Sequence, residues 1–170
     1  MLSKTKNTLS KINYRLFAVL VLMGLLPTIY TTVRIYFLGS LPGDWGYNIA
    51  SQLAWVNVLY EVVQEAIILP MFFFLGKSLQ SRVDFQNKAR TGLLLTAVTY
   101  TFMALAMILF ARPLLVFMAQ KQDLVAQTAH YIRLESIALI FATSVKFLTL
   151  VLVTMKKDIY LYIVLFVQMI

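Results

Sequence analysis

The chain has 170 residues, of which 61% are hydrophobic and 13% charged, and its formal net charge is +8. Soluble domains normally carry about 25% charged residues, so this composition excludes an ordinary soluble protein and predicts an all-α, polytopic membrane helix bundle. The chain contains no cysteine, which excludes a disulfide framework, a thiolate metal site and a cysteine nucleophile. Basic residues in such a chain normally reflect loop orientation, so we expect no nucleic-acid partner.

The first predicted element is an uncleaved transmembrane helix over residues 16–39. The basic tail before it resembles the start of a signal peptide, but the apolar segment is too long for a signal core and lacks a small-residue cleavage site. Pro27 has no backbone N–H, so we expect a kink there. Arg34 lies near the far end of this helix. An interfacial turn is expected over residues 40–51, which are rich in glycine, proline and aromatic residues.

The second predicted helix, residues 53–76, is long enough to cross a hydrocarbon core, which takes about 20 apolar residues. One stripe of this helix is polar, and its members are Asn57, Glu61, Gln64 and Glu65. An ionised carboxylate at the bilayer centre costs at least about 2.5 kcal/mol, so such groups usually face other helices or a water-filled cavity. We therefore expect Glu61 and Glu65, four residues apart, to face one space between helices.

A third helix is predicted over residues 91–111, after a polar loop. Its end is placed at the Arg112-Pro113 dipeptide, because the residue before a proline is pushed out of the α region. A short amphipathic turn should follow. The fourth helix, residues 132–155, carries Glu135 and Lys146 on one face.

The last apolar run, residues 159–170, is predicted to be the start of a fifth helix. At about 1.5 Å per residue it reaches about 18 Å into a core of roughly 30 Å, so the chain is expected to stop inside this helix. Four complete transmembrane helices and part of a fifth are therefore expected.

The distribution of basic residues predicts the topology. They gather in the N-terminal tail, in the loop after the second span and in the turn after the fourth. By the positive-inside rule, we expect a multi-pass protein of the cell membrane with a cytoplasmic N-terminus. Counting about 1.5 Å per residue, Arg34, Glu61 and Glu135 lie at similar depths near the outer interface, and Glu65 and Lys146 lie deeper.

Arg34 needs a partner or access to water, because a guanidinium does not release its proton in a protein. We expect a carboxylate to hold it, Glu61 in the first place and Glu135 in the second. The alternative is that the side chain snorkels to the interface.

Two segments resemble the multidrug and toxic compound extrusion (MATE) transporters. The stretch LLPTIYTTVRIYFLGSL, before a second span that ends in FFFLGKSL, is similar to the family pattern of an early proline followed by V-D-x-x-F-V-G-x-L. The matching residues are Val33, Phe37, Gly39 and Leu41, with Leu38 as a conservative replacement. The later stretch FARPLLVFMAQKQDLVAQTAHYIRLESIALIF resembles the family's segment after the third helix.

The resemblance implies that residues 1–170 are part of the N-terminal six-helix lobe of a twelve-helix transporter. Where the family pattern has an aspartate implicated in proton or sodium coupling, this chain has Arg34. A cation site cannot be carried over to a guanidinium. Coupling would then be moved to Glu61, Glu65 or Glu135, altered in kind, or absent.

Three functions remain open from the sequence. The leading hypothesis is a secondary active efflux transporter that moves amphipathic or cationic compounds by alternating access, driven by a proton or sodium gradient. The second is a lipid-linked oligosaccharide flippase, in which Arg34 would suit a pyrophosphate. The third is a non-transporting membrane scaffold whose buried charges only lock helices together.

The candidate substrate or ion pathway follows from the intramembrane charges. Its residues are Asn57, Glu61, Gln64, Glu65, Arg34, Glu135 and Lys146. The expected partners are membrane lipid, a small-molecule substrate and the remaining helices of the same transporter. No catalytic motif, P-loop or metal-ligand spacing is present, so we expect no enzyme, no metal and no cofactor apart from a coupling proton or sodium ion.

Overall fold

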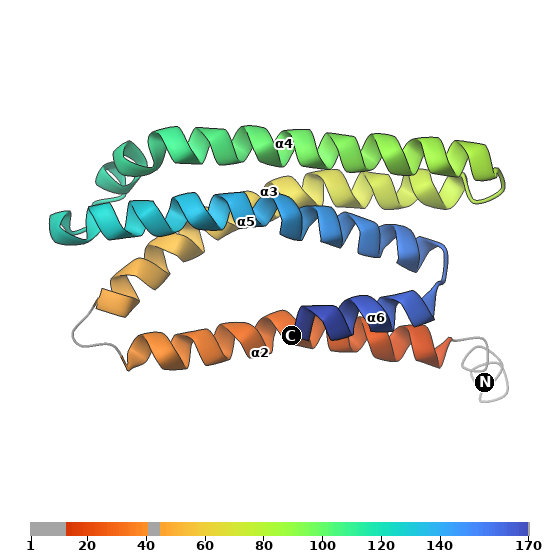
Figure 1. Cartoon of the computed structure of the whole chain (residues 1–170), viewed down its shortest axis with the longest axis horizontal. Coiled ribbons are helices and arrows are strands. Elements are labelled where there is room, and N and C mark those ends of the chain that lie inside the picture. The colour runs from red at the N-terminus through yellow and green to blue at the C-terminus, as the bar shows by residue number, and fades with distance from the viewer. Residues whose placement is uncertain (1–12, 41–44, 170) are drawn as a thin grey trace, which may run out of the picture.

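The computed structural model describes residues 13–40 and 45–169 (Figure 1). The helices of these residues are α2 (Tyr14–Gly39), α3 (Trp45–Lys77), α4 (Arg82–Phe117), α5 (Gln122–Thr154) and α6 (Asp158–Met169). The first four are long and apolar enough to cross a membrane, whereas α6 has 12 residues. The predicted all-α membrane helix bundle is confirmed. Most of the predicted basic tail and the centre of the predicted first turn, residues 41–44, lie outside the described residues.

The helices form two groups. Helices α4 and α5 pack along each other and, with α3, form the larger group, while α2 and α6 lie side by side as a separate pair (Figure 1). The pair is joined to the larger group at its two ends, through contacts of α2 with α3 and of α5 with α6. This arrangement leaves room for a cavity between α2, α5 and α6, which is described below.

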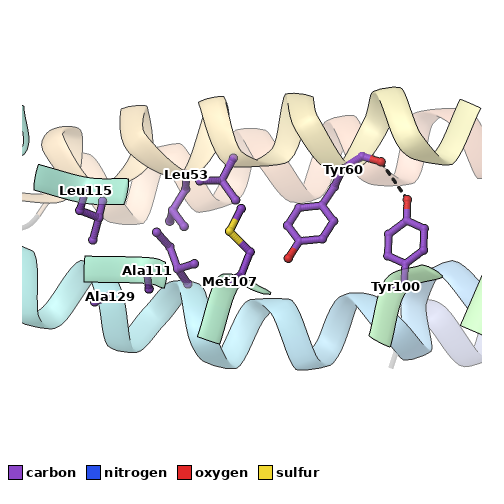
Figure 2. Packing of buried hydrophobic residues seen from close by; sticks show 9 residues of the cluster. Leu53, Tyr60, Tyr100, Met107, Ala111, Leu115 and Ala129 are labelled. Carbon is purple, nitrogen blue, oxygen red and sulfur yellow. Dashed lines mark hydrogen bonds between the residues drawn. The ribbon is translucent and has the colours of Figure 1, made fainter. Parts of the chain in front are cut away.

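Three buried clusters hold the helices together. The largest joins α3, α4 and α5 (Figure 2) and contains Leu53, Val56, Tyr60, Tyr100, Met107, Ala111, Leu115, Ala129 and Ile132. A second, at the opposite end of the same helices, contains Leu75, Phe85 and Phe147. The third joins α2 to α6 through Val19, Leu161 and Leu165. Each group of helices therefore has an apolar core of its own.

Close packing in the second cluster depends on a glycine. A Cβ atom at Gly92 of α4 would lie 2.4 Å from Cζ of Phe147 and 2.6 Å from Cε of Met71. Phe147 is fully buried, so its ring has little freedom to move away. The missing side chain of Gly92 thus allows α3, α4 and α5 to meet at one point.

The predicted loops before the second and third helices are partly wrong. Helix α3 begins at Trp45, and α4 begins at Arg82 inside the predicted polar loop. The α4 start is stabilised locally, because Ser81 accepts a hydrogen bond from the backbone N–H of Asp84 and Asp84 pairs with Lys88 at 2.8 Å. Hydropathy detects the apolar part of a helix, and polar turns that extend it go unnoticed.

The predicted end of the third helix at Arg112-Pro113 is also wrong. Helix α4 continues through Pro113 to Phe117, and α5 already begins at Gln122, ten residues before the predicted start. An internal proline removes one backbone donor, which a long, well-packed helix tolerates. Helix α2 is likewise continuous through Pro27.

The true end of α4 is a left-handed turn. Ala119 has φ 56°, its N–H donates to the Val116 carbonyl, and the N–H of Gln120 donates to the Leu115 carbonyl. This is the Schellman arrangement, in which the residue after the helix adopts the left-handed conformation. The end of α5 repeats it with Lys156 at φ 54°. Since neither residue is a glycine, the sequence gives no obvious signal for these turns.

Candidate binding site between the helices

Arg34 and Glu135 join α2 to α5. Nη1 of Arg34 lies 3.9 Å from Oε1 of Glu135, and the two side chains are only 24% and 20% exposed. The Arg34 guanidinium also lies over the ring of Tyr131, with Cζ 5.3 Å from the ring centroid. Asn57 of α3 hydrogen-bonds to the same glutamate. Glu135 is therefore the point at which side chains of α2, α3 and α5 converge.

A carboxylate holds Arg34 as predicted, but it is Glu135, the second of the two partners that the sequence suggested. Glu135 holds Arg34, and the preferred partner Glu61 was the wrong prediction. The depth estimate did not separate the two glutamates. In the structure, Glu135 is half-buried within reach of Arg34 of α2, whereas Glu61 is exposed.

A second polar contact joins α3 and α5 closer to the Thr154 end. Nζ of Lys146 donates to Oε1 of Gln64 at 3.0 Å. Lys146 and Glu135 share a face of α5, as predicted from their spacing, and each meets one of the polar residues predicted on α3. The structure therefore brings Asn57, Gln64, Glu135 and Lys146 together along one α3–α5 contact.

Two buried tyrosines lie between these polar contacts. The Tyr60 hydroxyl donates to Oγ of Ser136 at 3.0 Å. The Tyr100 hydroxyl donates to the Tyr60 carbonyl at 2.8 Å, the bond that is dashed in Figure 2. Sequence reasoning missed both. A signal was available for Tyr60, since it lies three residues after Asn57 and four before Gln64 and so belongs to the same stripe of α3.

Arg133 is a further charged residue of α5 that sequence reasoning missed. Its Nε donates to the Ile108 carbonyl of α4 at 3.1 Å, and the side chain is half-buried. It lies only two residues before Glu135, so the two charged groups leave α5 in different directions. Arg133 consequently ties α5 to α4, while Glu135 ties it to α2 and α3.

Glu61 and Glu65 are exposed. On the helical wheel of α3 they lie next to Asn57, and neither of them lines the hollow that Tyr47 and Ala50 form with α2. No ion pair holds either glutamate among the described residues. That they face one space between helices stays a prediction, since no helix of the described chain covers them.

A cavity of about 440 Å³ lies between α2, α5 and α6. Its lining residues are Leu20, Met23, Gly24, Leu26, Pro27, Tyr30, Lys146, Thr149 and Gln168. Most of the lining is apolar, and Lys146 is its charged member. Neither Glu61 nor Glu65 lines it. A cavity of this size falls within the range of about 300–1,000 Å³ that is typical of small-molecule sites.

The described ionisable groups were compared with the clusters that hold metal ions. Within residues 13–40 and 45–169, no group of three or more histidine, aspartate or glutamate side chains is close enough to hold a metal ion. The polar contacts instead pair cations with single oxygen acceptors from neighbouring helices.

Together these features define a polytopic membrane helix bundle whose spanning segments carry ionisable residues between helices. No protein-family model, curated protein or solved structure matches this chain.

Proposed function

We propose that the chain forms part of a MATE-like secondary transporter that moves amphipathic or cationic compounds by alternating access. The observation that carries the proposal is the exposure of Glu61 and Glu65 on α3, a helix long enough to span a membrane. Ionised carboxylates facing hydrocarbon are costly, so this face suits a water-filled route. Two carboxylates one helical turn apart, about 6 Å along the axis, attract cations.

Within this proposal, the ion pair of Arg34 with Glu135 reduces the number of carboxylates that could bind the coupling ion. Arg34 replaces the aspartate of the family pattern, and Glu135 is already engaged by Arg34 and Asn57. Among the candidate pathway residues in the part of the chain that the structure describes, Glu61 and Glu65 are the carboxylates for which no ion pair is found. We therefore assign proton or sodium coupling to these two residues.

The flippase alternative is weakened by the same pairing. Arg34 was its expected pyrophosphate ligand, and the neighbouring Glu135 carboxylate opposes the approach of a second anion. The scaffold alternative predicts that Glu61 and Glu65 are dispensable. The experiment below separates it from transport.

The test measures accumulation of ethidium, a lipophilic cation, in cells that express the protein. Accumulation should be lower than in cells without it, and Glu61→Gln combined with Glu65→Gln should restore the higher level. Asp84→Asn is the matched control, because Asp84 lies on the first turn of α4, outside the candidate pathway, and pairs with Lys88 of the same helix. Unchanged efflux in the double variant, at equal protein level, would contradict the proposal and favour the scaffold.

A further inference from the structure

We propose that the cavity between α2, α5 and α6 binds a single-chain amphiphile with an anionic carboxylate or phosphate head group. Lys146 is the head-group ligand, and the apolar face of α2 holds the tail. This goes beyond the proposed transport function, because the site binds such a molecule whether or not the chain moves anything across a membrane.

The head-group assignment rests on Lys146. It lies eight residues before the end of α5 at Thr154, about 12 Å along the helix axis, so its ammonium group is inside a spanning segment. The ion pairs found among the described residues are Arg34–Glu135 and Lys88–Asp84, so no carboxylate neutralises it. A charged group at such a position usually faces a partner or a cavity. Here it faces the cavity.

Lys146 is also oriented for a ligand. Gln64 accepts one of its three N–H groups, which leaves two donors for an incoming oxygen anion. Tyr30 and Thr149 line the same cavity and add hydroxyl groups. Charge-assisted hydrogen bonds of this kind are about twice as strong as those between neutral groups.

The tail assignment rests on α2. The lining residues of this helix extend from Leu20 to Tyr30, which is about 15 Å along the axis at 1.5 Å per residue. Leu20, Met23 and Leu26 make this wall apolar. The cavity is therefore elongated along an apolar helix and has a cation on its α5 wall, which is the complement of an anionic amphiphile.

Gly24 keeps the α2 wall open. A Cβ atom placed there would meet nothing within 4 Å, in contrast to the crowded position of Gly92. A larger side chain at Gly24 should therefore enter the cavity without displacing protein atoms. This provides a way to block the site that does not disturb the packing of the bundle.

The first experiment compares laurate, dodecanol and dodecyltrimethylammonium, which differ in their head groups. Binding to the protein in phosphatidylcholine nanodiscs is measured by titration, without any ion gradient. Laurate should bind more tightly than the other two. Lys146→Gln should weaken laurate binding about tenfold, which corresponds to about 1.4 kcal/mol, and Lys146→Arg should retain it. Lys77→Gln, a change at an exposed lysine outside the cavity, is the control.

The source of the ligand is distinguished by adding lysophosphatidylglycerol, a single-chain lipid with a phosphate head group, to the nanodiscs. If lysophosphatidylglycerol competes with laurate, a lipid head group occupies the site, whereas a lack of competition assigns the site to free fatty-acid anions. Equal binding of laurate and dodecanol, or an unchanged laurate affinity in Lys146→Gln, would overturn the proposal.

The second experiment fills the cavity. Gly24→Leu should abolish most laurate binding, while Gly76→Leu, at a glycine that also has open space around it but lies outside the cavity, should leave it unchanged. If Gly24→Leu binds laurate normally, the cavity is not the site. Because no gradient is applied, a failure of transport does not affect either experiment.

Discussion

Arg34 and Glu135 form the ion pair that connects the α2–α6 pair of helices to the larger group, five residues before the end of α2 at Gly39. Their charged atoms lie 3.9 Å apart, and neither side chain is more than a quarter exposed. Elsewhere the two groups meet mainly at their ends, through α2 with α3 and α5 with α6. The pair therefore adds to the α2–α3 contacts that hold the C-terminal part of α2 against the larger group.

The first prediction concerns this pair. Arg34→Leu and Glu135→Leu should each destabilise the protein by about 1–3 kcal/mol, between the values typical of exposed and of buried pairs, because each leaves a half-buried charge behind. The double variant should recover part of the loss. The measurement is the free energy of unfolding by denaturant in detergent, combined as a double-mutant cycle.

Lys88 and Asp84 provide the control for that cycle. They lie 2.8 Å apart on the surface of α4, and their side chains are 35% and 49% exposed. Their coupling should be about 0.3–0.5 kcal/mol, as for exposed pairs one helical turn apart. A coupling between Arg34 and Glu135 no larger than this would show that their proximity does not stabilise the fold.

The second prediction concerns the close approach at Gly92. Gly92→Ala should destabilise the protein by about 1–3 kcal/mol, since the added methyl group overlaps Phe147 and Met71. Gly76→Ala, where a Cβ meets no atom within 4 Å, should be neutral or stabilising. The thermal midpoints of both variants in detergent provide the comparison, and a midpoint of Gly92→Ala at or above that of the unaltered protein would refute the overlap.

The third prediction concerns the left-handed residue after α4. Ala119→Gly should stabilise the protein by about 0.5–1 kcal/mol, because a positive φ is costly for alanine and not for glycine. Met118→Gly is the control and should destabilise by a similar amount, since Met118 has φ −78° and gains nothing from a glycine. Denaturant unfolding of the two variants should move in opposite directions. Movement in the same direction would contradict the prediction.

The fourth prediction concerns the buried hydrogen bond between α3 and α5. Tyr60→Phe and Ser136→Ala should show a coupling of about 0.6 kcal/mol, the average found for hydrogen bonds between membrane helices. The value is small because the unfolded chain in the membrane also finds hydrogen-bond partners. Ser136 accepts from Tyr60 while its own O–H donates to the Ile132 carbonyl at 2.7 Å, so the two bonds do not compete. A double-mutant cycle of unfolding free energies measures the coupling. Strictly additive losses would show that the Tyr60–Ser136 hydrogen bond does not stabilise the protein.

The class of fold was accessible from the sequence because it depends on composition and on the length of apolar runs. The ends of the helices were harder to predict from the sequence. Residues 82–90 and 122–131 are polar and amphipathic, so hydropathy assigned them to loops, although both are helical. Pro113 was given too much weight, because its cost is set by packing around the whole of α4 and not by the dipeptide alone.

The candidate site was predictable where one helix determined it. The spacing of Glu135 and Lys146 on α5, and of Asn57 and Gln64 on α3, correctly placed each pair on one face. The choice of Glu135 over Glu61 as partner of Arg34 depends on how α3 is rotated relative to α5 and α2. That rotation is set by the packing of three helices, which residue periodicity in a single helix does not determine.

The left-handed turns at Ala119 and Lys156 have a consequence for how the bundle can deform. Each joins consecutive helices through very few residues, so α4, α5 and α6 cannot slide past one another along their axes. A tilt of the α2–α6 pair that pivots on the turn at Lys156 would therefore have to break both the contacts of α2 with α3 and the Arg34–Glu135 ion pair. Such a tilt would widen the spacing at Arg34 while leaving the contacts between α4 and α5 in place.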